Sequence, residues 1–99
     1  MEICHAIQNR TLLSFDYRGH LSVVIPVAHG SHKTTHNQIL RAYQIRGSRA
    51  DGGVPGWGIY RIDWMSNIQS LPEVFAAAPQ GYKRGDKDMS PIHCELYSP

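Results

Sequence analysis

An arginine and a tyrosine on one predicted strand are the first candidates for chemistry in this sequence. Arg41 and Tyr43 are two residues apart in an apolar segment, and strand alternation places such residues on one face, about 7 Å apart. An exposed ring can stack on a base, and a guanidinium binds phosphate through paired hydrogen bonds. Arg61 joins this face if its strand pairs with that of Arg41, as consecutive strands commonly do. These residues predict a platform for an anionic, nucleotide-like ligand; the competing interpretation is a solvated surface with an Arg61–Asp63 ion pair.

A glycine-rich connection supplies further candidates for the same ligand. Residues 47–58 contain five glycines and one proline, and glycine exposes backbone N–H groups that can surround an anion. Arg46 and Arg49 add positive charge, and Trp57 adds an aromatic ring. Because no phosphate-loop spacing is present, a plain hairpin loop with Trp57 in the core is the competing interpretation.

Three histidines offer a metal-binding or hydrolytic alternative. His29, His32 and His36 have side chains that zinc accepts as ligands. No carboxylate or cysteine lies among them, and their spacing is not that of a metalloprotease helix. The sequence also lacks a Gly-x-Ser-x-Gly nucleophile motif. We therefore expect no catalytic residue, metal or cofactor, and we keep a small hydrolase or phosphodiesterase that uses these histidines as an alternative function.

The composition limits the class of protein. Ninety-nine residues correspond to one domain, and a net charge of +2 is too small for a protein that coats duplex nucleic acid. No apolar run is long enough to span a membrane, and the N-terminus does not look like a signal peptide, so we expect a cytoplasmic location. Because the cytosol is reducing, we expect Cys4 and Cys94 to be two packed thiols, with a disulfide as the alternative.

Hydrophobic periodicity predicts a mainly β scaffold with one helix. The spacing of Ile3, Ala6 and Ile7 predicts a short helix over residues 2–9. Strands are predicted over residues 13–17, 21–27, 38–45, 59–65 and 68–71, with a loop over 28–37 and one helical turn over 73–78. Pro26 cannot donate to a strand ladder, so the second strand should be at a sheet edge or end there.

This order of elements predicts a small bent antiparallel sheet or barrel of about five strands. Its core should include Phe15, Leu40, Ala42, Ile62 and Leu71. The tail keeps apolar anchors among its charges. Its mixed-charge segment 81–89, with one aromatic residue, could lie over the platform as a lid, form a subunit contact, or remain a solvated turn.

The order of several segments resembles that of WYL-type domains. Residues 6–17, which end in Phe-Asp-Tyr, are similar to the opening of that family, and Pro26 follows two valines where the family has a Glu-Pro pair. Residues 40–44 are similar to the strand that names the family, and residues 60–65 match its aromatic-Arg-aliphatic-Asp strand. In place of the Trp-Tyr-Leu of the name, this chain has Gln-Ile-Leu at residues 38–40.

The resemblance implies an SH3-like (Sm-like) barrel formed by a single domain, residues 1–99. Its core would be residues 6–75, and residues 76–99 would pack on the barrel or on a partner subunit. It also implies binding of a nucleotide or short single-stranded nucleic acid. We expect a stand-alone, non-enzymatic module that senses or sequesters a nucleotide-like signal, such as a cyclic or immune-signalling nucleotide in a bacterium or phage. Open strand edges favour a homo-oligomer, and a protein-interaction module is the third possible function.

Overall fold

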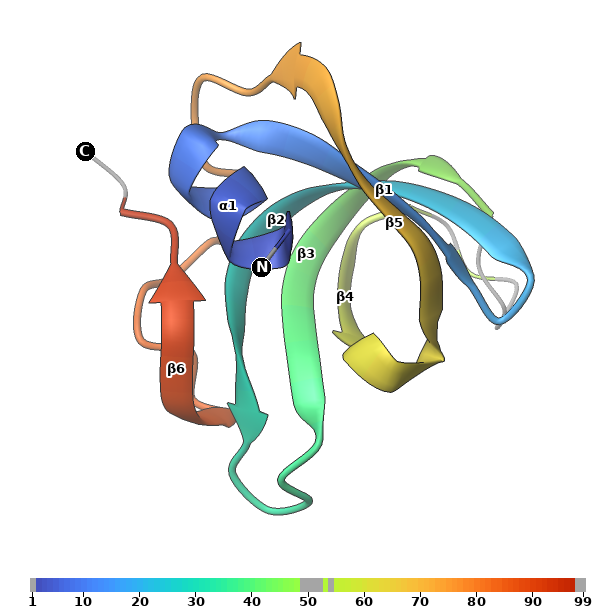
Figure 1. Cartoon of the computed structure of the whole chain (residues 1–99). Coiled ribbons are helices and arrows are strands. Elements are labelled where there is room, and N and C mark those ends of the chain that lie inside the picture. Colours follow the sequence, from blue (N-terminus) through green and yellow to red (C-terminus); the bar gives the residue numbers. More distant parts are fainter. Residues whose placement is uncertain (1, 49–52, 54, 98–99) are drawn as a thin grey trace.

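Six strands and one short α-helix form the described part of the chain, residues 2–48, 53 and 55–97, in a computed structural model. The elements are α1 (Glu2–Asn9), β1 (Thr11–Tyr17), β2 (His20–His32), β3 (Gln38–Gly47), β4 (Trp57–Arg61), the 3₁₀ helix η1 (Ile62–Trp64), β5 (Met65–Val74) and β6 (Met89–Glu95). The predicted mainly β fold with an N-terminal helix is confirmed (Figure 1). No helix in this described part is long and apolar enough to cross a bilayer.

The strands form one antiparallel sheet in the order β4-β3-β2-β1-β5, and β6 pairs with β2 outside that path. Within the described residues, β4 and β5 at the two ends of the path do not pair, so the sheet curls without closing (Figure 1). The bent sheet is therefore confirmed, and the SH3-like barrel is not formed.

Strand β2 is longer than predicted because it has two successive partners on one edge. β1 pairs with it as far as Val24, and β6 pairs with it from Ala28 to His32. The predicted loop over 28–37 is therefore wrong in its first half, since pairing with β3 on one edge and with β6 on the other extends the strand. The prediction that Pro26 lies at an edge or strand end is also wrong: Pro26 lies inside β2, beside a register shift against β3 and between the segments paired with β1 and β6. A missing N–H is tolerated at such an irregular point.

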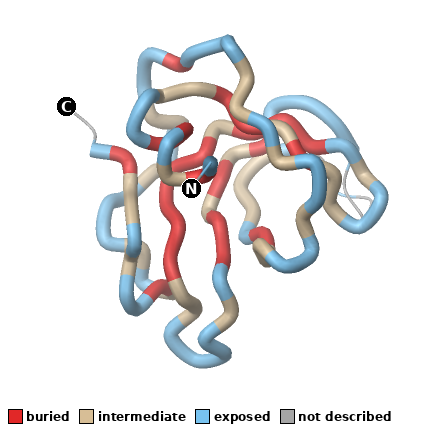
Figure 2. The backbone as a smooth tube through the Cα atoms, viewed as in Figure 1, coloured by how far each residue is buried: buried red, intermediate tan, exposed pale blue. Residues whose placement is uncertain are grey.

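The core lies between α1 and the curled sheet. Ile3, Ala6 and Ile7 are buried, as the helical spacing predicts. Phe15, Leu40 and Ala42 are fully buried, whereas Ile62 and Leu71 are only partly buried against the same core. Figure 2 shows the buried backbone concentrated along β2 and β3.

Two local predictions in the second half of the chain are wrong. The strand predicted over 59–65 ends at Arg61, where the chain forms η1 before β5 begins. The helical turn predicted over 73–78 is absent, because β5 continues to Val74 and the backbone N–H of Phe75 then donates to the carbonyl of Arg10, at 2.9 Å. After β5, the tertiary partner of the backbone therefore decides the local structure.

Cys4 and Cys94 form a disulfide, so the prediction of two separate thiols is wrong. Cys4 lies on α1 and Cys94 on β6, and the packing of these two elements brings their Cα atoms to 5.8 Å despite a sequence separation of 90. This distance is within the range that a disulfide bridges. The link attaches the C-terminal strand to the N-terminal helix.

Candidate functional site

The guanidinium of Arg41 already holds two carboxylates. From β3, its Nε donates to Asp86 Oδ2 at 2.8 Å, and its Nη2 donates to Asp86 Oδ1 at 3.2 Å and to Asp88 Oδ2 at 2.8 Å. The side chain of Asp86 is only 8% exposed and that of Arg41 is 24% exposed. The predicted open position of Arg41 is therefore wrong, since the tail covers this part of the platform.

Both members of the Arg41–Asp86 pair are charged at neutral pH. Burial alone would raise the pKa of Asp86, but hydrogen bonds from Arg41 and from the backbone N–H of Asp88 outweigh it and hold that pKa below its ordinary value. The hydrogen bond to Asp86 raises the pKa of Arg41, against the opposing effect of burial. The pair thus fixes the segment that carries Asp86 and Asp88 to β3 by charge as well as by geometry.

Trp57 is the second anchor of the tail. Trp57 faces Tyr43 across the β3–β4 ladder, and the two rings pack edge to face with centroids 5.4 Å apart. The indole Nε1–H donates to the carbonyl of Gln80 at 3.0 Å. Gly81 follows with φ +93°, and a Cβ at that position would be 3.2 Å from the indole nitrogen. Glycine therefore suits both the backbone conformation and the close approach to the ring.

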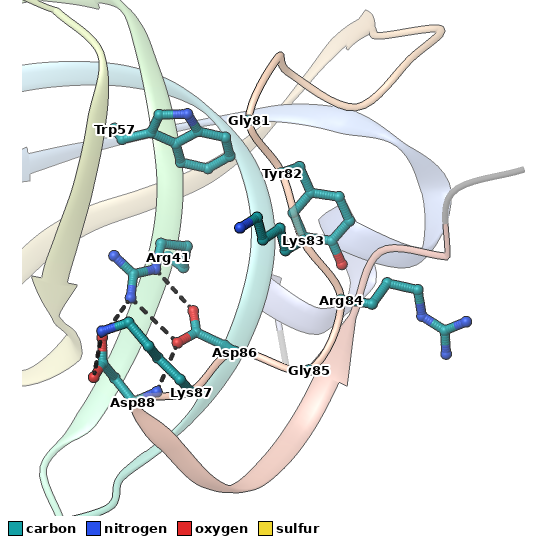
Figure 3. A pocket seen from close by; sticks show the side chains of 10 residues that line it. All are labelled: Arg41, Trp57, Gly81, Tyr82, Lys83, Arg84, Gly85, Asp86, Lys87 and Asp88. Atoms are coloured by element: carbon teal, nitrogen blue, oxygen red, sulfur yellow. Dashed lines mark hydrogen bonds and ion pairs between the residues drawn. The ribbon is translucent and has the colours of Figure 1, made fainter.

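A pocket of about 450 Å³ lies between these two anchors and the tail (Figure 3). Trp57 and Tyr82 contribute rings, and the lining contains four cationic side chains against two carboxylates. The lining residues are Arg41, Trp57, Gly81, Tyr82, Lys83, Arg84, Gly85, Asp86, Lys87 and Asp88. Its volume falls within the range of about 300–1,000 Å³ that is usual for small-molecule sites.

The four cations of the pocket are not equally available to a ligand. Arg41 is held by its two carboxylates, and Lys87 lies 3.4 Å from Asp88. Arg84 points away from Arg41, toward Glu95 at 3.6 Å and the ring of Tyr97 (Figure 3). Lys83 has no carboxylate within ion-pair distance among the residues that the structure describes, and its side chain lies beside Tyr82 with the amine toward the side of the pocket that Trp57 and Arg41 line (Figure 3).

Arg61 and Arg46, two other predicted site residues, do not line the pocket. The guanidinium of Arg61 binds Asp63 at 2.7 Å and stacks on Trp64, 4.2 Å from the ring centroid. Arg46 forms an exposed ion pair with Glu73 at 3.2 Å. Strand pairing does bring Arg61 into register with β3, opposite Ile39, but the side chain is engaged with residues of η1.

Of the predicted set, Arg41 and Trp57 therefore line the pocket, and Tyr43 packs directly behind Trp57. Arg49 lies outside the described residues. The sequence analysis did not select Lys83 or Tyr82 as individual site residues. The available signal was the mixed-charge segment 81–89 with its single aromatic residue, which does lie against β3 and β4.

The three histidines of the hydrolase alternative do not form a common site. His32 Nδ1 accepts the backbone N–H groups of Thr34 and Thr35 at 3.1 and 3.2 Å, and His36 lies in the turn with φ +64°. His29 is buried on β2, where burial lowers its pKa and the nearby His93 lowers it further, against a smaller raising effect of Gln38. Across the described residues, the group of three possible metal ligands that does converge is Cys4, His29 and Cys94.

Together these features describe a small mainly β protein with an open, bent sheet and a ring- and cation-lined pocket beneath its C-terminal segment. Comparison with family models, curated proteins and solved structures gives no match for this chain. The similarity to WYL-type domains therefore stays a prediction from the sequence.

Proposed function

We propose that this protein is a non-enzymatic module that binds a small, ring-containing anion of the nucleotide class in the pocket beside Trp57. The observation that carries the proposal is that Lys83, without a carboxylate partner among the described residues, lines the same pocket as the indole of Trp57. A base can stack on or against an aromatic ring, while an ammonium contacts phosphate. The excess of cations over carboxylates in the lining favours an anion over a neutral ligand.

The residues have different roles from those that the sequence suggested. Trp57 and Tyr82 contact the base, and Lys83 contacts the phosphate. Arg41 positions the wall of the pocket through Asp86 and Asp88. Arg61 and Arg46 have no role in this proposal, because their partners lie elsewhere.

A module of this kind senses or sequesters its ligand and leaves it chemically unchanged. Within the class, a mononucleotide, a cyclic nucleotide and the end of a short single strand share the base and phosphate that the pocket would recognise. A cytoplasmic location and assembly into a homo-oligomer remain predictions from the sequence.

Binding can be tested with defined probes. Thermal shift followed by calorimetric titration would use AMP, GMP, 3′,5′-cyclic AMP and oligo-dT, with adenosine and inorganic phosphate as fragments that carry only half of the recognised chemistry. We expect at least one nucleotide to bind more tightly than either fragment. Recovery of that nucleotide unchanged after heat denaturation would separate a binding module from a hydrolase.

Two variants that each remove one positive charge test where the nucleotide binds. Lys83→Ala should weaken nucleotide binding by about tenfold to a hundredfold, because a hydrogen bond to a charged group contributes about 1.5–3 kcal/mol. Arg46→Ala removes one positive charge outside the pocket and should bind like the parent protein. Equal binding by Lys83→Ala and the parent, or no binding of any nucleotide, would overturn the proposal.

A further inference from the structure

The cluster of Cys4, His29 and Cys94 has the side chains and the dimensions of a metal site. It draws one residue from each of α1, β2 and β6, and one potential ligand atom from each lies within 4.8 Å of the other two. Cys4 Sγ is 3.6 Å from His29 Nδ1. A tetrahedral zinc ion with Zn–S of about 2.3 Å and Zn–N of about 2.0 Å separates a sulfur and a nitrogen ligand by roughly 3.5 Å. The sulfur–nitrogen pair therefore already has the separation that zinc requires.

The imidazole of His29 is buried with weak partners, and an ion bound at Nδ1, the nitrogen beside Cys4 Sγ, would leave Nε2 as it is. This residue is 3% exposed, and its Nε2 has no hydrogen-bond partner. Its Nδ1 lies 3.6 Å from the sulfur of Cys4, which is a weak hydrogen-bonding partner. The amide of Gln38 is close enough to raise the pKa of His29, but its own hydrogen bonds are to Ser31 and His93. Buried polar side chains are nearly always satisfied, so an imidazole left in this state needs an explanation.

An irregularity in β6 brings a second imidazole, that of His93, beside the cluster, although His93 is not among the three residues whose ligand atoms lie within 4.8 Å of one another. His29 pairs with Cys94 and Gly30 pairs with Ile92, so β6 has an extra residue, His93, at this point. Simple alternation would point His93 and Cys94 to opposite faces. With the extra residue, the ring of His93 instead packs against that of His29, with centroids 5.1 Å apart.

We propose that Cys4, Cys94 and His29 bind a zinc-class divalent cation when their disulfide is reduced, with His93 as the fourth ligand. A dithiol reductant supplies two electrons and two protons to the Cys4–Cys94 bond and itself becomes a disulfide. The two thiols then lose one proton each to solvent as their sulfurs bind the ion. Opening of the S–S bond lets the sulfurs move apart to roughly 3.8 Å, the separation of two sulfur ligands on tetrahedral zinc.

The disulfide and the metal thus exclude each other, because the same sulfurs cannot form both. The oxidised form links α1 to β6 covalently, and the reduced form would join the same two elements through the ion. In either redox state the N-terminal helix stays attached to the C-terminal strand. This inference is independent of the proposed nucleotide pocket, which shares no residue with the cluster.

Cobalt(II) titration tests the site directly. The full chain would be reduced with a dithiol, freed of reductant under anaerobic conditions, and titrated with Co²⁺ and then Zn²⁺. We expect one Co²⁺ per chain, with thiolate-to-cobalt charge-transfer absorption and the visible bands of tetrahedral coordination, and bleaching of both when zinc displaces cobalt. The oxidised protein should show neither signal.

Variants of the cluster residues distinguish specific metal binding at this site from adventitious binding. Cys94→Ser should weaken cobalt binding at least a hundredfold, and His93→Ala should weaken it less and change the visible bands. His32→Ala, which lies outside the cluster, should bind like the parent. If reduction unfolds the chain, zinc must restore the β-sheet circular dichroism spectrum.

Three results would overturn the proposal. The first is a folded, reduced parent protein that does not bind cobalt stoichiometrically. The second is a chain that is unfolded by reduction and stays unfolded in the presence of zinc. The third is a Cys94→Ser variant that binds as tightly as the parent.

Discussion

Replacing Asp86 with asparagine should destabilise the protein, because Asp86 is the less exposed partner of Arg41. Asp86→Asn keeps the shape of the side chain and one oxygen acceptor but removes the charge that receives three hydrogen bonds, two from Arg41 and one from the backbone N–H of Asp88. Such bonds contribute about 1.5–3 kcal/mol. Breaking a fully buried pair costs about 3–5 kcal/mol, and the effect here is smaller because Arg41 is partly exposed and keeps Asp88. We expect a loss of about 2 kcal/mol, which corresponds to a decrease in Tm of about 8–16 °C for a domain of this size.

The pH dependence of this loss has a definite sign. The folded state holds the pKa of Asp86 below its ordinary value of 3.8. The stability that the charge contributes is therefore complete above that value and is lost as pH falls through the lower folded-state value. Urea denaturation at a series of pH values should show parent and Asp86→Asn far apart at pH 7 and converging at pH values below 3.8.

A matched variant tests whether loss of any carboxylate charge, rather than that of Asp86, lowers the stability. Asp63→Asn removes the charge from the exposed pair with Arg61 and should leave the denaturation midpoint nearly unchanged. Equal stability of Asp86→Asn and the parent at pH 7 would refute the argument. A difference that persists undiminished in strong acid would also refute it.

Three further substitutions test the fold. Gly30→Ala should cost about 1–3 kcal/mol in urea denaturation, since its Cβ would lie 2.5 Å from the carbonyl oxygen of Pro91; an unchanged midpoint would show that β2 and β6 are not so close. Tyr17→Phe should cost about 1 kcal/mol, because the backbone N–H of Arg61 loses the hydroxyl that accepts it at 3.0 Å, and a neutral effect would mean that water replaces this bond. Cys4→Ser should lower the unfolding free energy by about 2–4 kcal/mol under non-reducing conditions; if thermal unfolding of the oxidised parent and the variant coincide, the disulfide does not form.

Elements that depend on local pattern were predictable from the sequence. The helix over residues 2–9 has the predicted bounds, and the strands near residues 13–17 and 38–45 are extended by only two residues. In each, apolar spacing alone indicates the element and its buried face. β6 and residues 28–32 of β2 were missed for the opposite reason, since their structure depends on pairing with other strands: β6 pairs with β2 across about 60 residues of sequence, and this part of β2 also pairs with β3.

The candidate site was likewise predictable only where local sequence pattern indicates it. Arg41 and Trp57 could be selected as site residues because a cation and an aromatic ring on paired strands are suited to binding an anionic, ring-containing ligand. No local pattern reveals that Asp86 and Asp88, more than 40 positions later, return to occupy the guanidinium of Arg41. Pairing of consecutive strands was expected to bring Arg61 to the face of Arg41, and that pairing is present, but the ion pair with Asp63, which was the competing interpretation, determines where the side chain lies.

The central claim, that a nucleotide binds beside Trp57, is tested most directly by the indole signals of a ¹⁵N-labelled sample. The chain has two tryptophans, Trp57 and Trp64, and only Trp57 lines the pocket. Titration with AMP, GMP, 3′,5′-cyclic AMP or oligo-dT should shift the Trp57 Nε1–H resonance, which is bonded to Gln80 in the free protein, and leave that of Trp64 in place. In Lys83→Ala the same shift should require about ten times more nucleotide or more. A Trp57 resonance that none of these probes moves, or a shift confined to Trp64, would contradict the account.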